Sequence, residues 1–283
     1  MRAASGTVFH QMYIFSFSLS ICLACADGGS GGNGSTDDSL NGNGMNGGDS
    51  SFAGGSNNGN GTTNVEGQNC QTIQAVVRDF RGKDENSGHP DFQAYTGDGP
   101  TLGLVNAMLD GDNKPTYTGL VVDSDNRQIT SSASFAQWYR DVPNVNQRFT
   151  IELPLTDGVF DDQTFFPITG QGFGDRLVNG QNNNFHFTTE ISTRFTYEAS
   201  KNLVFTFIGD DDLWIFVNGR LALDLGGLHP AETGTIDFNA KAAELGLVDG
   251  STYDMRIFHA ERRTDKSTFR VQTNIQCFVN GLI

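Results

Sequence analysis

Basic side chains are scarce in this chain. Lys and Arg together number 18 against 33 Asp and Glu among 283 residues, so the formal net charge is −15. Binding to the phosphates of DNA or RNA needs a basic face. The shortage of Lys and Arg therefore argues against a nucleic-acid partner, and the excess of carboxylates suits an acidic surface that tolerates calcium.

Signatures of common catalytic sites are also missing. The sequence contains no His-Glu-x-x-His helix and no phosphate-binding loop. Residues 110–114 imitate the start of an EF-hand loop, but no glycine stands at the sixth position and the twelfth is Val121 rather than Glu. Adjacent Asp side chains that share one ion are not opposed across a glycosidic bond as hydrolysis requires. We therefore expect a protein that is not an enzyme.

Long helical periods are absent, and short runs rich in Phe, Val, Ile and Thr recur between turn residues. This pattern predicts an all-β fold, an antiparallel β-sandwich or barrel with at most one or two short helices, at residues 133–139 and 240–245. The run at 213–217 is apolar on both faces, which predicts a central strand with Trp214 in the core. The expected strands are 72–80, 149–155, 184–191, 195–197, 203–208, 213–217, 221–225, 235–238, 253–260 and 268–277.

The first 25 residues have the features of an export signal, with Arg2 ahead of a short, largely apolar run that is too short to span a bilayer. Ala24-Cys25 at its end resembles the processing site of a bacterial lipoprotein. The resemblance implies lipidation of Cys25 and a membrane-anchored protein at the cell surface. Simple secretion, with cleavage after Ala24 or Ala26, is the alternative.

Residues 26–68 hold 14 Gly and 8 Asn and no Lys or Arg. Such a composition cannot build a core and predicts a disordered tether. Residues 69–283 are long enough for one all-β domain. Cys70 and Cys277 bracket that domain, and in an exported protein we expect them to form a disulfide rather than to remain two buried thiols.

Residues 209–219, Gly-Asp-Asp-Asp-Leu-Trp-Ile-Phe-Val-Asn-Gly, place three carboxylates before an apolar strand that ends in a type I′ turn. A regular register across this turn sets Ile215 opposite Ala222 and Leu213 opposite Asp224. The four carboxylates of Asp210, Asp211, Asp212 and Asp224 then gather at one end of the sheet. Close carboxylates repel one another and recruit a counter-ion, and oxygen ligands favour calcium.

Several ordered blocks between about residues 76 and 275 resemble the fibro-slime domain family, which is related to the protective-antigen-type β-sandwich of adhesins. The blocks are Val77-Arg78-Asp79-Phe80, His89-Pro90-Asp91-Phe92, Phe165-Phe166-Pro167-Ile168, Asn184-Phe185-His186-Phe187-Thr188, residues 209–219, Asp224-Leu225-Gly226-Gly227-Leu228-His229, and Glu261-Arg262-Arg263 with Ser267. The related lectins hold calcium with two consecutive Asp residues and bind sugar hydroxyls through it. The resemblance places this pair on Asp210 and Asp211.

The lectins also supply an Asn from a later loop, whereas residues 259–267 contain none, so Asp265 or a backbone carbonyl would take its place. His229 is a further candidate for ligand contact. We therefore expect a calcium-dependent module that binds an extracellular glycan or matrix component. The alternative is a structural matrix domain whose rim is held by an ion network of these Asp residues with Arg262 and Arg263, without sugar binding.

Overall fold

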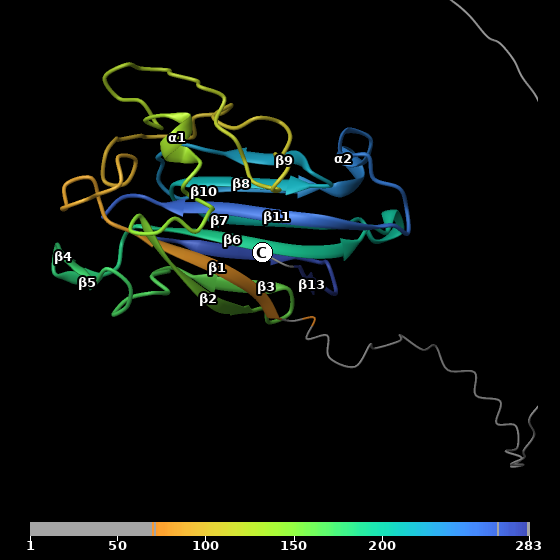
Figure 1. The fold of residues 1–283 in the computed structure, drawn as a ribbon. Coiled ribbons are helices and arrows are strands. Elements are labelled where there is room, and N and C mark those ends of the chain that lie inside the picture. The colour runs from red at the N-terminus through yellow and green to blue at the C-terminus, as the bar shows by residue number, and fades with distance from the viewer. Residues whose placement is uncertain (1–69, 71, 265, 282–283) are drawn as a thin grey trace, which may run out of the picture. The chain divides into compact units, whose positions relative to one another are not determined.

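The computed structural model describes residue 70, residues 72–264 and residues 266–281 of the chain. In these residues two antiparallel sheets are stacked face to face, and a long irregular segment covers the outer face of the larger sheet (Figure 1). The expectation of an antiparallel β-sandwich with two short helices is confirmed.

The larger sheet has seven strands, and every pairing within it is antiparallel. Its order is β2 (Asn146–Pro154), β1 (Thr72–Phe80), β6 (Phe187–Thr196), β11 (Thr252–Glu261), β8 (Asp212–Val217) and β9 (Arg220–Leu225), with β13 (Val279–Asn280) paired to β6. The smaller sheet has the order β10 (Glu232–Asp237), β7 (Val204–Gly209), β12 (Phe269–Thr273) and β3 (Val159–Asp162).

The main core lies between the two sheets. On β7, Phe205 and Phe207 are fully buried while their neighbours are half-buried, which is the alternation expected of a strand with one inward face. Ile215 and Ile257 face them from the larger sheet within the same cluster. Burial of so many large side chains is the main favourable contribution to the stability of this sandwich.

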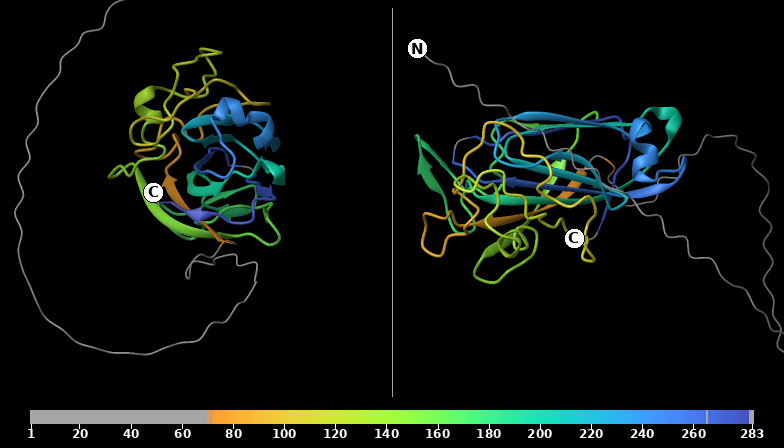
Figure 2. Two further views of the ribbon diagram at one scale, coloured as in Figure 1. Left: turned by 90° about the vertical axis from the view of Figure 1, so that its right-hand side faces the viewer. Right: turned by 90° about the horizontal axis from the view of Figure 1, so that it is seen from above.

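A second core lies on the other face of the larger sheet. Residues 81–145, drawn in orange through yellow to light green in Figures 1 and 2, contain no strand and pack Phe92, Phe135 and Trp138 against Trp214 and Phe258. Strand β8 is therefore buried along its whole length, with Leu213 in the first core and Trp214 in the second. The expected position of Trp214 in the core is confirmed.

The helices differ little from expectation. Helix α2 (Phe238–Leu245) begins at the N-cap Asp237, whose side chain accepts a hydrogen bond from Ala240 N, and ends at Gly246 in the left-handed conformation. Helix α1 (Ser132–Phe135) is shorter than predicted, and Ala199–Lys201 form a 3₁₀ turn. The expected strand at 195–197 is the end of β6. Strands β3 and β13 and the hairpin of β4 (Arg176–Val178) and β5 (Gln181–Asn183) were not predicted.

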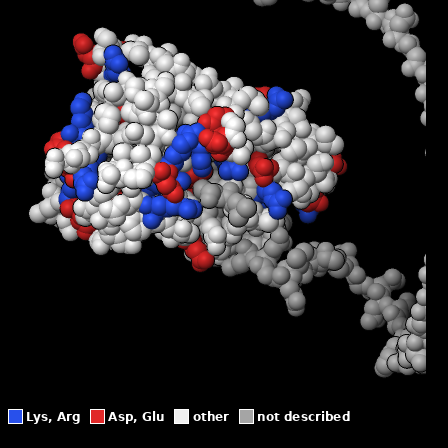
Figure 3. All heavy atoms as spheres, viewed as in Figure 1, with Lys and Arg blue, Asp and Glu red and all other residues white. Residues whose placement is uncertain are grey.

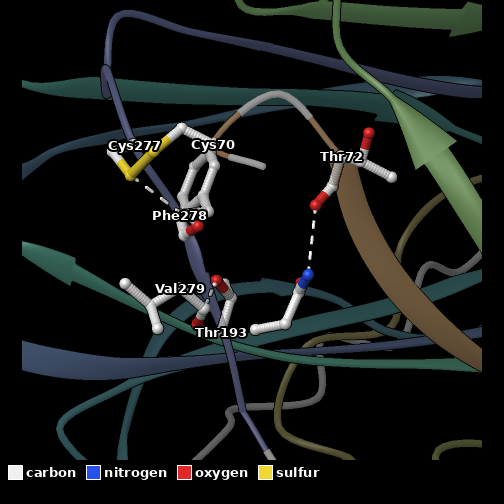
Figure 4. The surroundings of a disulfide bond; sticks show 7 residues. Cys70, Thr72, Thr193, Cys277, Phe278 and Val279 are labelled. Atoms are coloured by element: carbon white, nitrogen blue, oxygen red, sulfur yellow. Dashed lines mark hydrogen bonds between the residues drawn. A yellow bond between two sulfur atoms is a disulfide. The ribbon is translucent and has the colours of Figure 1, made fainter. Parts of the chain in front are cut away.

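Cys70 and Cys277 form a disulfide, as expected, with their Cα atoms 4.4 Å apart (Figure 4). The bond joins the segment that leads into β1 to the segment that leads into β13. Beside it, Asn280 Nδ2 donates to Thr72 O at 3.2 Å and Thr193 Oγ1 donates to Val279 O at 3.1 Å. The C-terminal segment is thus fixed to β1 and β6 by covalent and hydrogen bonds.

Candidate functional site

The β8–β9 hairpin contains a bulge that changes the expected register. Val217 pairs with Arg220 next to the turn, but the register shifts between Ile215 and Phe216, so Ile215 lies opposite Leu223 rather than Ala222. Trp214 rather than Leu213 then faces Asp224. The predicted register is therefore wrong beyond the bulge, because one extra residue moves the following side chains to the other face of the strand.

Asp224 consequently lies on the side of the sheet that Trp214 faces. Its Oδ1 accepts hydrogen bonds from Trp214 Nε1 and Gly226 N, both at 3.0 Å, and its Oδ2 accepts one from Gly103 N at 2.8 Å. A Cβ atom at Gly226 would lie 2.7 Å from the indole ring, so only glycine fits this approach. Asp224 holds the hairpin to the covering segment.

Asp212 also binds protein donors with both oxygens. Its Oδ1 accepts from Gly227 N at 2.7 Å, and its Oδ2 accepts from Arg262 Nε at 2.6 Å. Both side chains are fully buried. The expected gathering of four carboxylates does not form, since Asp212 and Asp224 are each hydrogen-bonded to their own set of donors.

Asp210 and Asp211 occupy the turn between β7 and β8. Asp210 Oδ1 accepts from Thr268 N at 3.0 Å, and Asp211 Oδ2 accepts from Arg262 N at 2.8 Å. Asp211 has a left-handed backbone with φ +54°, which Asp tolerates better than most residues. Burial raises the pKa of both carboxyl groups, that of Asp211 to about 6 against the opposing effect of Arg262.

Glu261 is a third acidic member that sequence analysis missed. It ends β11, is 1% exposed, and its Oε1 accepts from Arg263 N at 3.2 Å. Its Oε2 is buried and has no hydrogen-bond partner in the described structure. Burial and then the charge of Asp211 raise the pKa of Glu261 well above its usual value. The only hint in the sequence was its place in the Glu261-Arg262-Arg263 block.

These three carboxyl groups line one open cavity of about 930 Å³. His229 also lines it, and its ring nitrogens each lie 2.8 Å from a backbone carbonyl, Nδ1 from Pro230 O and Nε2 from Leu225 O. Asp98, Arg263 and Lys266 complete the charged part of the lining. Asp265 lies outside the described residues, as do Cys25, the expected signal and the expected tether.

The structure thus brings Asp210, Asp211 and His229 to one cavity and separates Asp212 and Asp224 from them. In the described part of the chain, no group of three or more His, Cys, Asp or Glu side chains is placed so that it could hold a metal ion. None of the helices there has the length and apolar character that crossing a membrane needs. On the face shown in Figure 3, cationic and acidic side chains are interspersed.

A comparison with protein families matches part of this chain. The model of the PA14 domain matches residues 172–278, which run from the loop before β4 to the segment before β13. The described chain therefore has a PA14 β-sandwich fold. The narrower fibro-slime assignment stays a prediction.

Among curated proteins, this chain is similar to the protein psiH of Dictyostelium discoideum, with 48% identity over 230 residues that cover 73% of this chain and 30% of psiH. It is also similar to the protein psiI of the same organism, with 45% identity over 66% of this chain and 28% of psiI. The chain spans only about a fifth to two fifths of the length of the curated relatives it matches. Relatives from this organism give no support to a bacterial lipoprotein.

Solved structures with remote similarity include a domain titled a PA14 sugar-binding domain from an RTX adhesin, at a TM-score of 0.30 and 10% identity over 74% of this chain and 95% of that one. Another is the epithelial adhesin 6 A domain of Candida glabrata in complex with Galb1-3GlcNAc, at a TM-score of 0.34 and 15% identity over 76% and 87%. A β-glucosidase from Kluyveromyces marxianus is also similar, at a TM-score of 0.26 and 10% identity over 68% and 19%.

Proposed function

We propose that this domain is an exported surface module that binds an extracellular glycan or matrix component through calcium. The observation that carries the proposal is the pair of neighbouring carboxyl groups of Asp211 and Glu261. Both are at least 95% buried, the charge of Asp211 adds to burial in raising the pKa of Glu261, and Glu261 Oε2 has no hydrogen-bond partner among the described residues. Two such groups are satisfied only when a proton or a cation lies between them.

The donors present suit a hard cation. Asp210, Asp211 and Glu261 offer only oxygen atoms, and a backbone N–H fixes one oxygen of each. Calcium takes about 6–8 oxygen ligands, so three carboxylates leave several positions for carbonyls, water or the hydroxyls of a ligand. Because no three such side chains are placed to hold a metal ion in the described structure, Asp210, Asp211 and Glu261 would have to move closer together to hold it. The ion would supply positive charge and open coordination positions at the cavity that these residues line.

The cavity favours a ligand of sugar size. Its volume of about 930 Å³ is near the upper end of the range for small-molecule sites, about 300–1,000 Å³. The PA14 match supports a glycan, because the related sandwich lectins use a consecutive pair of Asp residues in this way. Asp210 and Asp211 are such a pair, and Glu261 belongs to the stretch 259–267 that corresponds to the lectin loop with the Asn.

Binding is favoured over hydrolysis. Glycosidases separate their two carboxyl groups by about 5 Å or more on either side of the scissile bond. The Asp211 and Glu261 side chains are both at least 95% buried and their charges interact, so they are not exposed on opposite faces of a bound sugar ring. Export is supported by the Cys70–Cys277 disulfide, because such bonds persist in oxidising compartments. Attachment to a membrane through Cys25 is a further part of this proposal.

The second candidate is a structural matrix domain without a glycan ligand. The buried Arg262–Asp212 pair favours it, since this is the ion network expected under that alternative. The two candidates predict different behaviour of Asp211, which lies beside that network but also lines the cavity.

Calcium titration by calorimetry tests the proposal on the full chain. We expect Asp211→Asn and Glu261→Gln each to weaken calcium binding at least tenfold, because each removes a ligand charge and keeps the shape. Asp254→Asn is the matched control, since it removes one carboxylate from the opposite end of β11. Unchanged calcium affinity in Asp211→Asn, or no binding by the unaltered chain, would rule out the calcium site.

A glycan array with and without a chelator then separates the two candidates. The proposed binding module retains at least one glycan class with calcium and loses it with the chelator, and Asp211→Asn loses it in both conditions. A structural matrix domain would bind no glycan on the array in either condition. Its stability would still depend on the buried pair of Arg262 and Asp212.

A further inference from the structure

The cavity is lined by two cations as well as by the acidic cluster. Arg263 and Lys266 belong to the segment between β11 and β12, and both face the cavity that Asp210 and Asp211 line. Neither forms an ion pair with any residue in the described structure, whereas Arg78, Lys114, Arg140, Arg176 and Arg262 all do. Within the described residues, no ion pair therefore occupies either of these two cations, and both are open to a ligand in the cavity.

Arg263 is held in place by the protein. Its backbone N donates to Glu261 Oε1 at 3.2 Å, and its Nη1 donates to Tyr95 O at 2.8 Å. A guanidinium carries five N–H donors in a fixed planar fork. Only one of them is bonded within the described residues, so the others remain for an anion. Lys266 is exposed and adds a second positive charge on the same segment.

The described charges of the cavity leave room for an anionic group. The acidic residues of the lining are Asp98, Asp210, Asp211 and Glu261. A divalent ion at the last three would offset two of these four negative charges, and Arg263 and Lys266 would offset the other two. The described residues of the occupied site would then carry no net negative charge to repel an anion.

We propose that the preferred ligand is an acidic glycan, whose hydroxyls meet the cation at Asp210 and Asp211 while a carboxylate or sulfate substituent pairs with Arg263 and Lys266. This inference rests on the proposed function of the same cavity and specifies its ligand class. Arg pairs with carboxylate and sulfate through two parallel N–H···O bonds, which gives orientation as well as attraction. Because Lys266 is exposed, its contribution is screened by salt more strongly than that of Arg263.

The test compares the full, calcium-loaded chain on glycans that differ by one anionic group. The probes are galactotriose against trigalacturonate for the carboxylate, and N-acetyllactosamine with and without a 3-O-sulfate for the sulfate. We expect the acidic member of at least one pair to bind ten times or more tightly, and the pair that shows the difference identifies the anion. Raising the salt concentration should reduce that difference.

Three variants show whether the cations cause the preference. Arg263→Gln should abolish most of it, Arg263→Lys should restore part, and Lys266→Gln should reduce it about two- to threefold. Arg220→Gln is the control, because it removes the same charge at the turn end of the β8–β9 hairpin and leaves the cavity intact. Equal melting temperatures of these variants would establish that all are folded.

Two results would overturn the inference in distinguishable ways. If neutral and acidic members bind equally and chelator still abolishes binding, the acidic ligand class is wrong and the proposed function stands. If no glycan binds in the presence of calcium, the proposed function fails and this inference fails with it. A preference that survives Arg263→Gln unchanged would also contradict the assigned role of Arg263.

Discussion

Arg262 places its Nε 2.6 Å from Oδ2 of Asp212, and both side chains are fully buried. Its Nη1 donates to Gln128 O at 2.5 Å, and its guanidinium lies 4.8 Å from the centre of the Trp138 ring. One side chain thus connects the end of β11, the start of β8 and the covering segment of residues 81–145. Its backbone N donates to Asp211 Oδ2. The Arg262 side chain therefore stabilises the fold, and its main chain positions a carboxylate of the cavity.

The first prediction concerns this buried pair. Arg262→Met leaves the Asp212 carboxylate buried without its partner, so we expect a loss of about 3–5 kcal/mol in the free energy of unfolding. The double variant Arg262→Met/Asp212→Leu should recover most of that loss, because no uncompensated charge remains. Urea unfolding measures both. A loss under about 1 kcal/mol in the single variant, the range of exposed pairs, would contradict a structural role for the pair.

The second prediction concerns pH and Asp211. Burial raises the pKa of Asp211 from 3.8 to about 6 in the folded chain, so the folded state binds a proton that the unfolded state has released. The contribution of Asp211 to stability is therefore present below pH 3.8 and is lost as the pH rises to about 6. We expect the chelated chain to show this decline, and Asp211→Asn to lack it.

Urea midpoints at pH 4, 5, 6 and 7 in the presence of a chelator measure the difference between the two chains. Asp79, whose pKa burial also raises to about 6, contributes equally to both and cancels. Added calcium at pH 7 should raise the midpoint of the unaltered chain and leave that of Asp211→Asn in place. Identical pH profiles would show that Asp211 does not carry the extra proton.

The third prediction concerns His259, which is fully buried among Phe165, Phe187 and Phe269. Neither ring nitrogen has a hydrogen-bond partner in the described structure, and burial lowers its pKa to about 3. The unfolded chain binds a proton there below about pH 6.5, so His259 costs stability as the pH falls from 6.5 towards 3. We expect His259→Leu to be stabilising, and more so at pH 5 than at pH 7.

His186 is the matched control for that change. Burial also lowers its pKa to about 3, but its Nε2 lies 3.2 Å from Gln93 Oε1. His186→Leu removes this contact and should cost about 1 kcal/mol at pH 7. The measurement is the melting temperature of the unaltered chain, His259→Leu and His186→Leu at pH 5 and pH 7. If His259→Leu lowers the melting temperature at both pH values, the His259 imidazole makes a stabilising hydrogen bond and the prediction is wrong.

The fourth prediction concerns the disulfide. Cys70 and Cys277 are 207 positions apart, so their bond restricts a very long loop in the unfolded chain. In the chain-entropy model, Cys70→Ser/Cys277→Ser should lower the free energy of unfolding by about 5 kcal/mol, and strain or residual structure would reduce that value. The measurement is urea unfolding of the double variant and of the unaltered chain in its oxidised and reduced forms. Equal urea midpoints for the oxidised and reduced chain would contradict a stabilising disulfide.

Local patterns were sufficient to predict much of the fold. Strand β1 has the predicted bounds, and β7 shows the predicted alternation because a half-buried strand selects apolar residues at every second position. The short strands β4 and β5 were not predicted. Gln181–Asn183 are all polar, so their own sequence shows no strand pattern, and they are extended because they pair with β4. His186 alternates with Phe185 and Phe187 in the sequence, and it is 2% exposed because Phe92 and Gln93 of the covering segment contact its ring.

The site was predictable only where its members are neighbours in sequence. Asp210 and Asp211 stand side by side, so their repulsion is visible from the sequence alone. Glu261 lies 50 residues after Asp211, at the end of β11. Its place beside the Asp pair depends on how β11 pairs with β6 and β8, which the residues around Glu261 do not show. Asp224 was misplaced because a single bulge at Ile215 and Phe216 reverses the side-chain direction beyond it.

The disulfide also determines how the domain would bear a mechanical load. The disulfide joins the beginning and the end of the domain's chain, since the Cα atoms of Cys70 and Cys277 are 4.4 Å apart. A pulling force applied to the chain on the outer side of each Cys would pass through the covalent bond and bypass the strands between them. Hydrogen bonds between β1 and β6 would then not be sheared, and the cavity at the β7–β8 turn would keep its geometry under tension.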